Sequence, residues 1–189
     1  MSEARSQKFC RGEESASSAD IRPGPWRSWR AWRLYSGSGR LACMPSGFRY
    51  IGRMASDNVL RQAARFHGHL GPWLVLGLKA GTYARRKLAA SPFELNARVF
   101  CPAGTPHTCF VDGVQFSSGC TMGKGNISHT HAAGCRVDFR RKGRGGRVRL
   151  ALRPEVWDEL HSRPSKGMAG ATRLGREFAR RPMKELFTE

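Results

Sequence analysis

Two short segments of this chain bring together residues that can bind a metal ion or move a proton: two histidines, two cysteines and one aspartate. His67 and His69 lie one residue apart in the segment FHGHLGPWLVLGLKAG, and Cys109, Asp112 and Cys120 lie in the segment CFVDGVQFSSGCTMGKGN. Imidazole nitrogen and thiolate sulfur suit zinc, and a structural zinc site uses about four such ligands. Either both imidazoles reach one ion, or one histidine caps a turn while the other packs in the core. Asp112 either orients a histidine from behind the metal, acts as a general base, or only favours the start of a helix.

The segment GCTMGKGN, residues 119–126, has the composition of a loop that holds an anion. Its glycines let backbone N–H groups converge, and Lys124 adds a positive charge. The segment is not a Walker P-loop, because Asn126 stands two residues after Lys124 and the GxxxxGK[ST] spacing is not met. The alternative is a structural turn with Lys124 in solvent. The candidate pocket residues are Asp112, Thr121, Gly123, Lys124, Gly125 and Asn126.

A predicted helix over residues 72–88 follows the two histidines. Pro72 suits a first helical turn, and the N-terminus of such a helix is electropositive, so the histidines face a site for an anion or a metal-bound ligand. Gly77 and Gly81 lie one turn apart, and we expect another backbone to approach the helix there. The other expected elements are helices over 57–66, 109–118, 154–162 and 171–187, the last interrupted at Pro182, and strands over 93–100, 126–131, 136–140 and 147–152.

Together, the two segments resemble the E-subunit family of formylmethanofuran dehydrogenase over roughly residues 57–160. That family typically reads FHGH, a Cys-Pro pair, an apolar helix with spaced glycines, and later a Cys, an Asp-containing helix and a block like GCTxGKGN. One departure stands out, because Gly71 occupies the position before Pro72 where the family usually has Cys. The matching residues are Phe66, His67, Gly68, His69, Pro72, Gly77, Gly81, Cys109, Asp112, Gln115, Gly119, Cys120, Thr121, Gly123, Lys124, Gly125 and Asn126.

This resemblance implies a metal-binding accessory module, with zinc as the expected ion. The enzyme it serves uses a molybdenum or tungsten pterin to interconvert carbon dioxide and a formyl carrier, and the module is not the redox subunit. The resemblance also implies that FHGH and the later cysteines come together, with His69 and Cys109 as the first expected ligands and His67 and Cys120 as the next. If the Cys missing at position 71 is a ligand in relatives, the site is weakened or lost here. The expected partners are other formylmethanofuran dehydrogenase subunits or a second copy of the chain.

The charge of the chain points to a different kind of partner. The formal net charge is +19 over 189 residues, which favours binding to nucleic acid or another acidic surface. No nucleic-acid-binding motif supports this, and the excess of Arg over Lys also fits compositional bias. The 6 cysteines match no disulfide framework and no CxxC zinc knuckle. Without a signal peptide or an apolar run of the ~18 residues that span a bilayer, we expect a cytoplasmic protein with reduced thiols and no membrane contact.

Composition changes along the chain and predicts one domain with two tails. Residues 1–53 lack periodicity and Met54 opens a sensible start, so we expect 1–53 to be disordered or a spurious N-terminal extension. Residues 54–162 are predicted to form the domain that resembles the E-subunit family, and residues 163–189 a basic C-terminal tail with a helical pattern. The expected fold class is α+β, a single domain with helices packed on a small, mostly antiparallel sheet, flanked by disordered tails.

Three functions follow from these patterns. The leading one is a metal-binding accessory domain linked to one-carbon and formyl metabolism. The alternatives are a stand-alone small metalloenzyme that uses the same fold and a basic nucleic-acid-binding module. Because one fold serves many functions, the arrangement of the site residues has to separate the three.

Overall fold

The structure is a computed structural model that describes residues 56–143, 145–163, 165 and 167–189. Residues 1–53, for which we expect an extension, lie outside the described residues. The helices are α1 (Asp57–His67), α2 (Pro72–Lys87), α3 (Cys109–Ser118), α4 (Pro154–Ser162), α5 (Gly167–Arg180) and α6 (Met183–Leu186), with a short 3-10 turn η2 (Met122–Lys124). The strands are β1 (Leu95–Cys101), β2 (Ile127–His131), β3 (Arg136–Arg141), β4 (Arg147–Leu152) and β5 (Phe187–Thr188).

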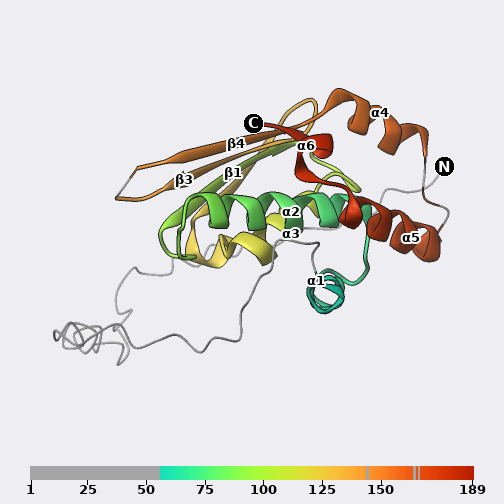
Figure 1. Cartoon of the computed structure of the whole chain (residues 1–189), viewed down its shortest axis with the longest axis horizontal. Helices are drawn as coiled ribbons and strands as arrows, with labels where there is room; N and C mark the ends of the chain where they lie inside the picture. The colour runs from blue at the N-terminus through green and yellow to red at the C-terminus, as the bar shows by residue number, and fades with distance from the viewer. Residues whose placement is uncertain (1–55, 144, 164, 166) are drawn as a thin grey trace, which may run out of the picture. The chain divides into compact units, whose positions relative to one another are not determined.

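The described strands form one sheet in the order β2-β1-β3-β4-β5. β1 and β2 are parallel, and every other neighbouring pair is antiparallel. Along β1, Leu95, Ala97 and Val99 are buried while Arg98 between them is exposed, as expected when one face of a sheet is covered and the other is open. The helices α2 and α3 lie side by side against the sheet (Figure 1). The predicted α+β class with a mostly antiparallel sheet is confirmed.

Helices α2 and α3 touch backbone to backbone. A Cβ atom added to Gly77 would overlap the carbonyl oxygen of Phe110 and lie 2.9 Å from the Cα of Gly113. A Cβ atom added to Gly113 would overlap the carbonyl oxygen of Leu74. Only glycine permits this separation, so the close approach predicted at Gly77 is confirmed, and α3 is the neighbouring backbone. The crossing fixes the position of α3, and with it the side chains of its first turns.

The C-terminal segment belongs to the domain. Helix α5 buries Leu174 and Phe178, and Phe178 has no exposed surface. Strand β5 pairs with β4 through Phe187 opposite Leu152, and Lys79 of α2 donates to the carbonyl oxygens of residues 179 and 181. The expected domain end at residue 162, with a tail after it, is therefore wrong, because the apolar stripe of α5 outweighs its basic composition. The helix break at Pro182 is confirmed.

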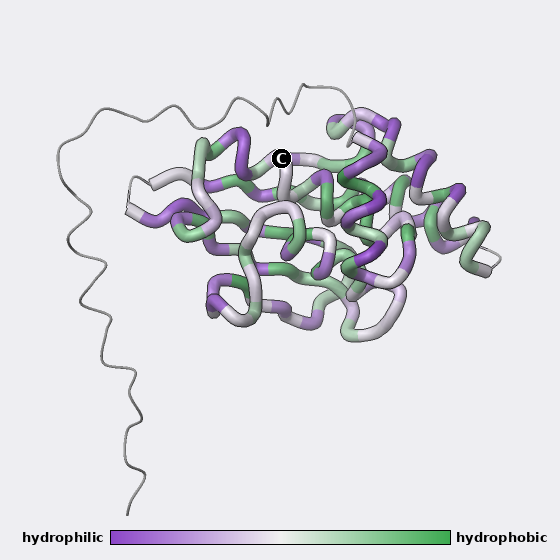
Figure 2. Tube along the Cα trace, turned by 90° about the horizontal axis from the view of Figure 1, so that it is seen from below, coloured by the Kyte–Doolittle hydropathy of each residue, from purple (hydrophilic) through white to green (hydrophobic). Residues whose placement is uncertain are grey.

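The hydrophobic residues gather in the middle of this fold, where the strands and helices meet (Figure 2). Within the described ranges, no helix combines the length and the apolar character needed to cross a bilayer.

Candidate functional site

His67 and Asp112 form the centre of the candidate site. His67 is the last residue of α1, and Gly68 ends the helix in the left-handed conformation with φ 97°. The Nδ1 atom of His67 lies 2.7 Å from Oδ2 of Asp112, which stands in the first turn of α3. A carboxylate only accepts, so Nδ1 carries the proton and Nε2 presents its lone pair. Within the described part of the chain, this Nε2 is buried and has no hydrogen-bond partner.

His69 stands beside this pair. Its ring centroid lies 4.8 Å from that of His67, and its side chain is half-buried. Burial lowers the pKa of His69, and the neighbouring His67 lowers it further. The ring is therefore neutral at pH 7 and keeps a nitrogen lone pair for a metal ion. The chain thus brings two imidazoles and one orienting carboxylate together from two segments.

Position 71, where this chain departs from the resembled family, faces the same site. Gly71 precedes α2 in an extended conformation, φ −127° and ψ 163°, which any residue can adopt. A Cβ atom at this position would lie 3.2 Å from Nε2 of His69. A side chain at position 71 would therefore point toward a candidate ligand atom, and glycine leaves that side of His69 open.

Cys109 begins α3 as a buried thiol. Burial raises its pKa, and the carboxylate of Asp112 raises it further. A metal ion would have to displace the thiol proton before Cys109 could bind. Across the residues with a described placement, no group of three or more His, Cys, Asp or Glu side chains is arranged to hold a metal ion. The imidazole pair with its orphaned Nε2 fits an ion that keeps open coordination positions, whereas the described residues form no closed four-ligand site.

Cys120 lies beyond the other end of α3. A helix of ten residues is about 15 Å long, so Cys109 and Cys120 occupy opposite ends of it. The thiol of Cys120 is fully buried and donates to the carbonyl oxygen of Leu95 at 3.3 Å. The structure therefore gives Cys120 a contact with β1 and separates it from Cys109.

The GCTMGKGN loop is held by Asn126, which is buried. Its side-chain oxygen accepts from the backbone N–H of Thr121 at 2.9 Å. Its amide nitrogen donates to the carbonyl oxygens of Pro92 at 3.0 Å and Leu95 at 2.9 Å. These bonds close the loop and attach it to the start of β1. Asn126 therefore has a structural role here.

The loop glycines and Lys124 lie on the outer side of this turn. Gly125 adopts a left-handed conformation with φ 60°, and a Cβ atom added to Gly123 would meet open space. Lys124 is exposed, with its Nζ 5.8 Å from the ring centroid of Phe93.

Gln115 connects the loop to the His67–Asp112 pair and was absent from the predicted site. Its amide nitrogen donates to Oδ1 of Asp112 at 3.3 Å, and its oxygen accepts from the backbone N–H of Met122 at 3.1 Å. Asp112 and Gln115 are three residues apart on a helix and so share a face, which is the signal that could have identified Gln115. Through Gln115, the loop and the histidine pair belong to one hydrogen-bonded network.

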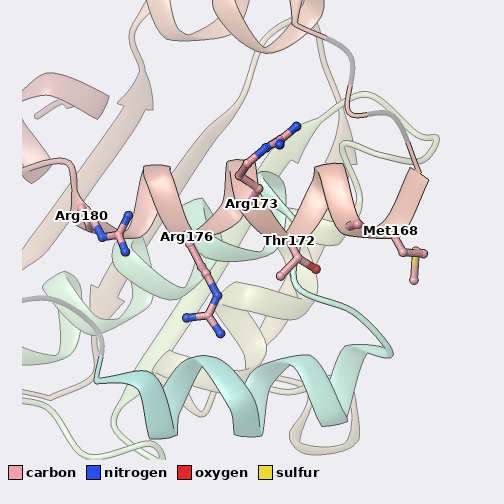
Figure 3. A pocket seen from close by; sticks show the side chains of 6 residues that line it. Met168, Thr172, Arg173, Arg176 and Arg180 are labelled. Atoms are coloured by element: carbon pink, nitrogen blue, oxygen red, sulfur yellow. The ribbon is translucent and has the colours of Figure 1, made fainter.

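A separate hollow of about 480 Å³ runs along α5. Figure 3 shows α1 beside this helix, with the side chain of Arg176 directed toward it, and Arg176 Nη1 pairs with Asp57 Oδ1 at 3.3 Å. The lining residues are Met168, Ala169, Thr172, Arg173, Arg176 and Arg180, which include none of the predicted site residues.

The fold and site define a small α+β domain that presents two neighbouring histidines, one of them held by a carboxylate. The family described as "FmdE, Molybdenum formylmethanofuran dehydrogenase operon" matches residues 66–188, which is most of the described chain. The chain belongs to this family, and the resemblance predicted from the FHGH and GCTMGKGN segments is confirmed. The match reaches residue 188, in agreement with the place of α5 and β5 in the fold.

A curated relative adds a shorter similarity. A protein of Archaeoglobus fulgidus named "Probable S-adenosyl-L-methionine-binding protein" is 33% identical over 76 residues, which are 36% of this chain and 19% of that protein. This chain therefore spans only a small part of the relative's length.

Proposed function

We propose that this domain is an accessory module of formyl and one-carbon metabolism that binds one divalent metal ion, zinc in the first instance. One observation carries the proposal: the His67 ring is held by Asp112 while its other nitrogen is buried and unpartnered among the described residues. Metal-binding histidines in proteins commonly donate their second ring N–H to a carboxylate in this way. Membership of the FmdE family supports the link to formylmethanofuran dehydrogenase.

In this proposal the residues have separate tasks. His67 Nε2 and the neutral ring of His69 hold the ion, and Asp112 keeps His67 in the required tautomer. Gln115 holds the second oxygen of Asp112 and so limits its rotation. A zinc ion bound here would supply Lewis acidity and would leave positions open for a ligand.

The open positions also suggest why such a module would need a partner. Two imidazoles leave at least two positions of a tetrahedral ion to water, to Cys109 after loss of its proton, or to a group from another protein. We propose other formylmethanofuran dehydrogenase subunits, or a second copy of this chain, as the source of that group.

Zinc stoichiometry and affinity of the purified protein test the metal site. We expect about one zinc per chain, binding at least tenfold weaker in His67→Gln and His69→Gln, and 10–100-fold weaker in Asp112→Asn. His129→Gln is the matched control, because His129 is an exposed histidine on β2 that contacts Cys101. Zinc binding that is unchanged in both His67→Gln and His69→Gln would refute the assignment.

A second candidate function rests on the open face of the sheet, which is strongly basic. Arg140 and Arg147 are exposed and stand directly opposite each other on β3 and β4, an arrangement of like charges that costs stability in a sheet. On the same face, the guanidinium of Arg136 lies 4.0 Å from the ring centroid of Phe100. A polyanion such as a nucleic-acid backbone would relieve the repulsion and gain a stacking surface.

Salt dependence tests this second candidate. Binding to generic duplex DNA should weaken steeply with salt, and the double variant Arg140→Gln/Arg147→Gln should reduce the slope of log affinity against log salt by about 2. Arg173→Gln on α5 is the control and should leave the slope unchanged. Absence of salt-dependent binding in the unaltered chain would remove this candidate and leave the metal site untouched.

A further inference from the structure

A second pair of histidines lies away from His67 and His69, at the surface between α4 and the loop after β1. The Nε2 atom of His107 lies 3.0 Å from the Nε2 atom of His161. His107 comes from the loop that leads into α3, and His161 from the last turn of α4. The two residues are 54 positions apart in the chain, so the tertiary fold alone creates the pair.

Hydrogen bonding determines what His161 offers to its partner. Its Nδ1 lies 2.7 Å from the carbonyl oxygen of Trp157, which can only accept. Nδ1 therefore carries the proton, and Nε2 presents a lone pair toward His107. Two lone pairs would repel each other at this distance, so either an N–H proton of His107 or a metal ion lies between the two nitrogens.

His107 can present a ring nitrogen to a metal ion when its remaining proton sits on the other nitrogen. Burial lowers its pKa and the neighbouring His161 lowers it further, while the backbone of Gly104 acts in the opposite direction. The ring is therefore neutral at pH 7, and a neutral imidazole can bind a metal through either nitrogen.

Two tryptophans hold the rings in place. Trp157 stacks on His107 with centroids 5.2 Å apart and an angle of 15°, and Trp73 meets His107 edge-on at 4.8 Å. Trp157 also contacts His161 at 4.5 Å. Because Trp73 is buried and belongs to α2, the cluster is anchored to the core.

The separation of the two nitrogens indicates a coordination geometry. With metal–imidazole bonds of about 2.0–2.1 Å, nitrogens 3.0 Å apart subtend an angle of about 90–97° at the metal. A tetrahedral ion would place them about 3.3 Å apart for the same bonds. The ring centroids lie 5.2 Å apart, so the two Nε2 atoms face each other as in an N–H···N hydrogen bond. When both rings turn toward a common ion, this separation suits two adjacent positions of a square-planar or octahedral ion, the geometries that copper(II) and nickel(II) adopt with nitrogen ligands.

We propose that His107 and His161 together bind one divalent transition-metal ion of the nickel(II) or copper(II) type, at a surface site independent of His67 and His69. The remaining coordination positions face solvent, since His161 is exposed. A bound metal ion would link the loop before α3 to α4. In the structure these two segments already meet through the His107–His161 and His107–Trp157 contacts.

Nickel(II) is the probe for the test, because copper(II) also oxidises thiols. The full chain without an affinity tag is titrated with nickel chloride at pH 7.5, and heat and tryptophan fluorescence are recorded. We expect one nickel per chain at this site, with quenching of tryptophan fluorescence. In His107→Gln and in His161→Gln the affinity should fall at least tenfold and the added quenching should disappear.

A control variant separates this site from others. His129→Gln should keep both the nickel affinity and the quenching, and thermal unfolding without metal should show that all variants fold. Nickel affinity that stays within twofold in both His107→Gln and His161→Gln would overturn the proposal. Equal loss of binding in His129→Gln would also overturn it, because the ion would then bind elsewhere. If one cluster variant fails to fold, the other carries the same test.

Discussion

An added methyl group at Gly113 on α3 should strongly lower the free energy of unfolding. In an ordinary helix, replacing glycine by alanine stabilises by about 1 kcal/mol. Here the new Cβ would overlap the carbonyl oxygen of Leu74 and lie 2.8 Å from the backbone nitrogen of Leu78. Both neighbours are backbone atoms of α2, which cannot rotate away as a side chain can. The helices would have to separate, and a gap of about 0.5–1 Å already forfeits about a quarter to a half of each dispersion contact along the interface.

The expected magnitude for Gly113→Ala follows from this geometry. Overpacking of a core typically costs about 1–3 kcal/mol, and an unyielding backbone neighbour places this variant at the upper end, about 3 kcal/mol after the propensity gain. For a domain of this size the midpoint of thermal unfolding should fall by about 10 °C. Zinc binding should weaken as well, because α3 carries Asp112 and its displacement breaks the contact with His67.

Gly170→Ala is the matched control for this measurement. Gly170 is also helical, in α5, but a Cβ atom there would meet its nearest heavy atom at 3.5 Å, an ordinary contact. We expect this variant to be neutral or to stabilise by up to about 1 kcal/mol. Thermal and urea unfolding of both variants measure the contrast. If Gly113→Ala were as stable as Gly170→Ala, the backbone contact between α2 and α3 could not be what positions α3.

Three further predictions address the loops around the site. The pKa of Glu94 is lowered from 4.5 to about 2 by the backbone N–H of residue 91 and by Arg141, so Glu94→Gln should destabilise at pH 7. The ionised carboxylate contributes its full stabilisation above pH 4.5 and loses it as the pH falls from 4.5 to about 2. The unfolding midpoints of the variant and the unaltered chain should therefore converge over that range. A constant difference would contradict the assignment. Gly71→Cys should tighten zinc binding, because a side chain at position 71 points at His69 Nε2, and an unchanged zinc affinity would mean that the thiol never reaches the ion. Asn126→Ala should cost about 2–4 kcal/mol in urea unfolding, since all three hydrogen bonds of this buried side chain are lost. A cost below about 1 kcal/mol would show that the loop closes without this side chain.

Local signals predicted most of the secondary structure. Pro72 at the first turn marks the start of α2, and Gly119 in the left-handed conformation ends α3, both at the residues expected. Ser56 caps α1 through a bond from the N–H of Val59 to its hydroxyl. These signals act within four residues along the chain, so a sequence pattern records them without knowledge of the tertiary fold.

Of the candidate site, the sequence alone indicated His67, His69 and Asp112 by residue type, and it indicated a close approach at Gly77. The tertiary structure decides their geometry, because His67 at the end of α1 and Asp112 in α3 are 45 residues apart and meet only when the two helices pack. The same holds for Cys120, whose thiol faces the carbonyl oxygen of Leu95 at the far end of α3.

Caps, turns and apolar periodicity are local properties, so the sequence predicts the helices, most strands and the types of the chemical groups. Which of those groups meet depends on the tertiary packing. It added α5 and β5 to the domain, placed β2 parallel to β1, and created the His107–His161 pair. Each of these outcomes depends on contacts between residues distant in the chain, and a pattern along one segment contains no information on which distant segment will pack against it.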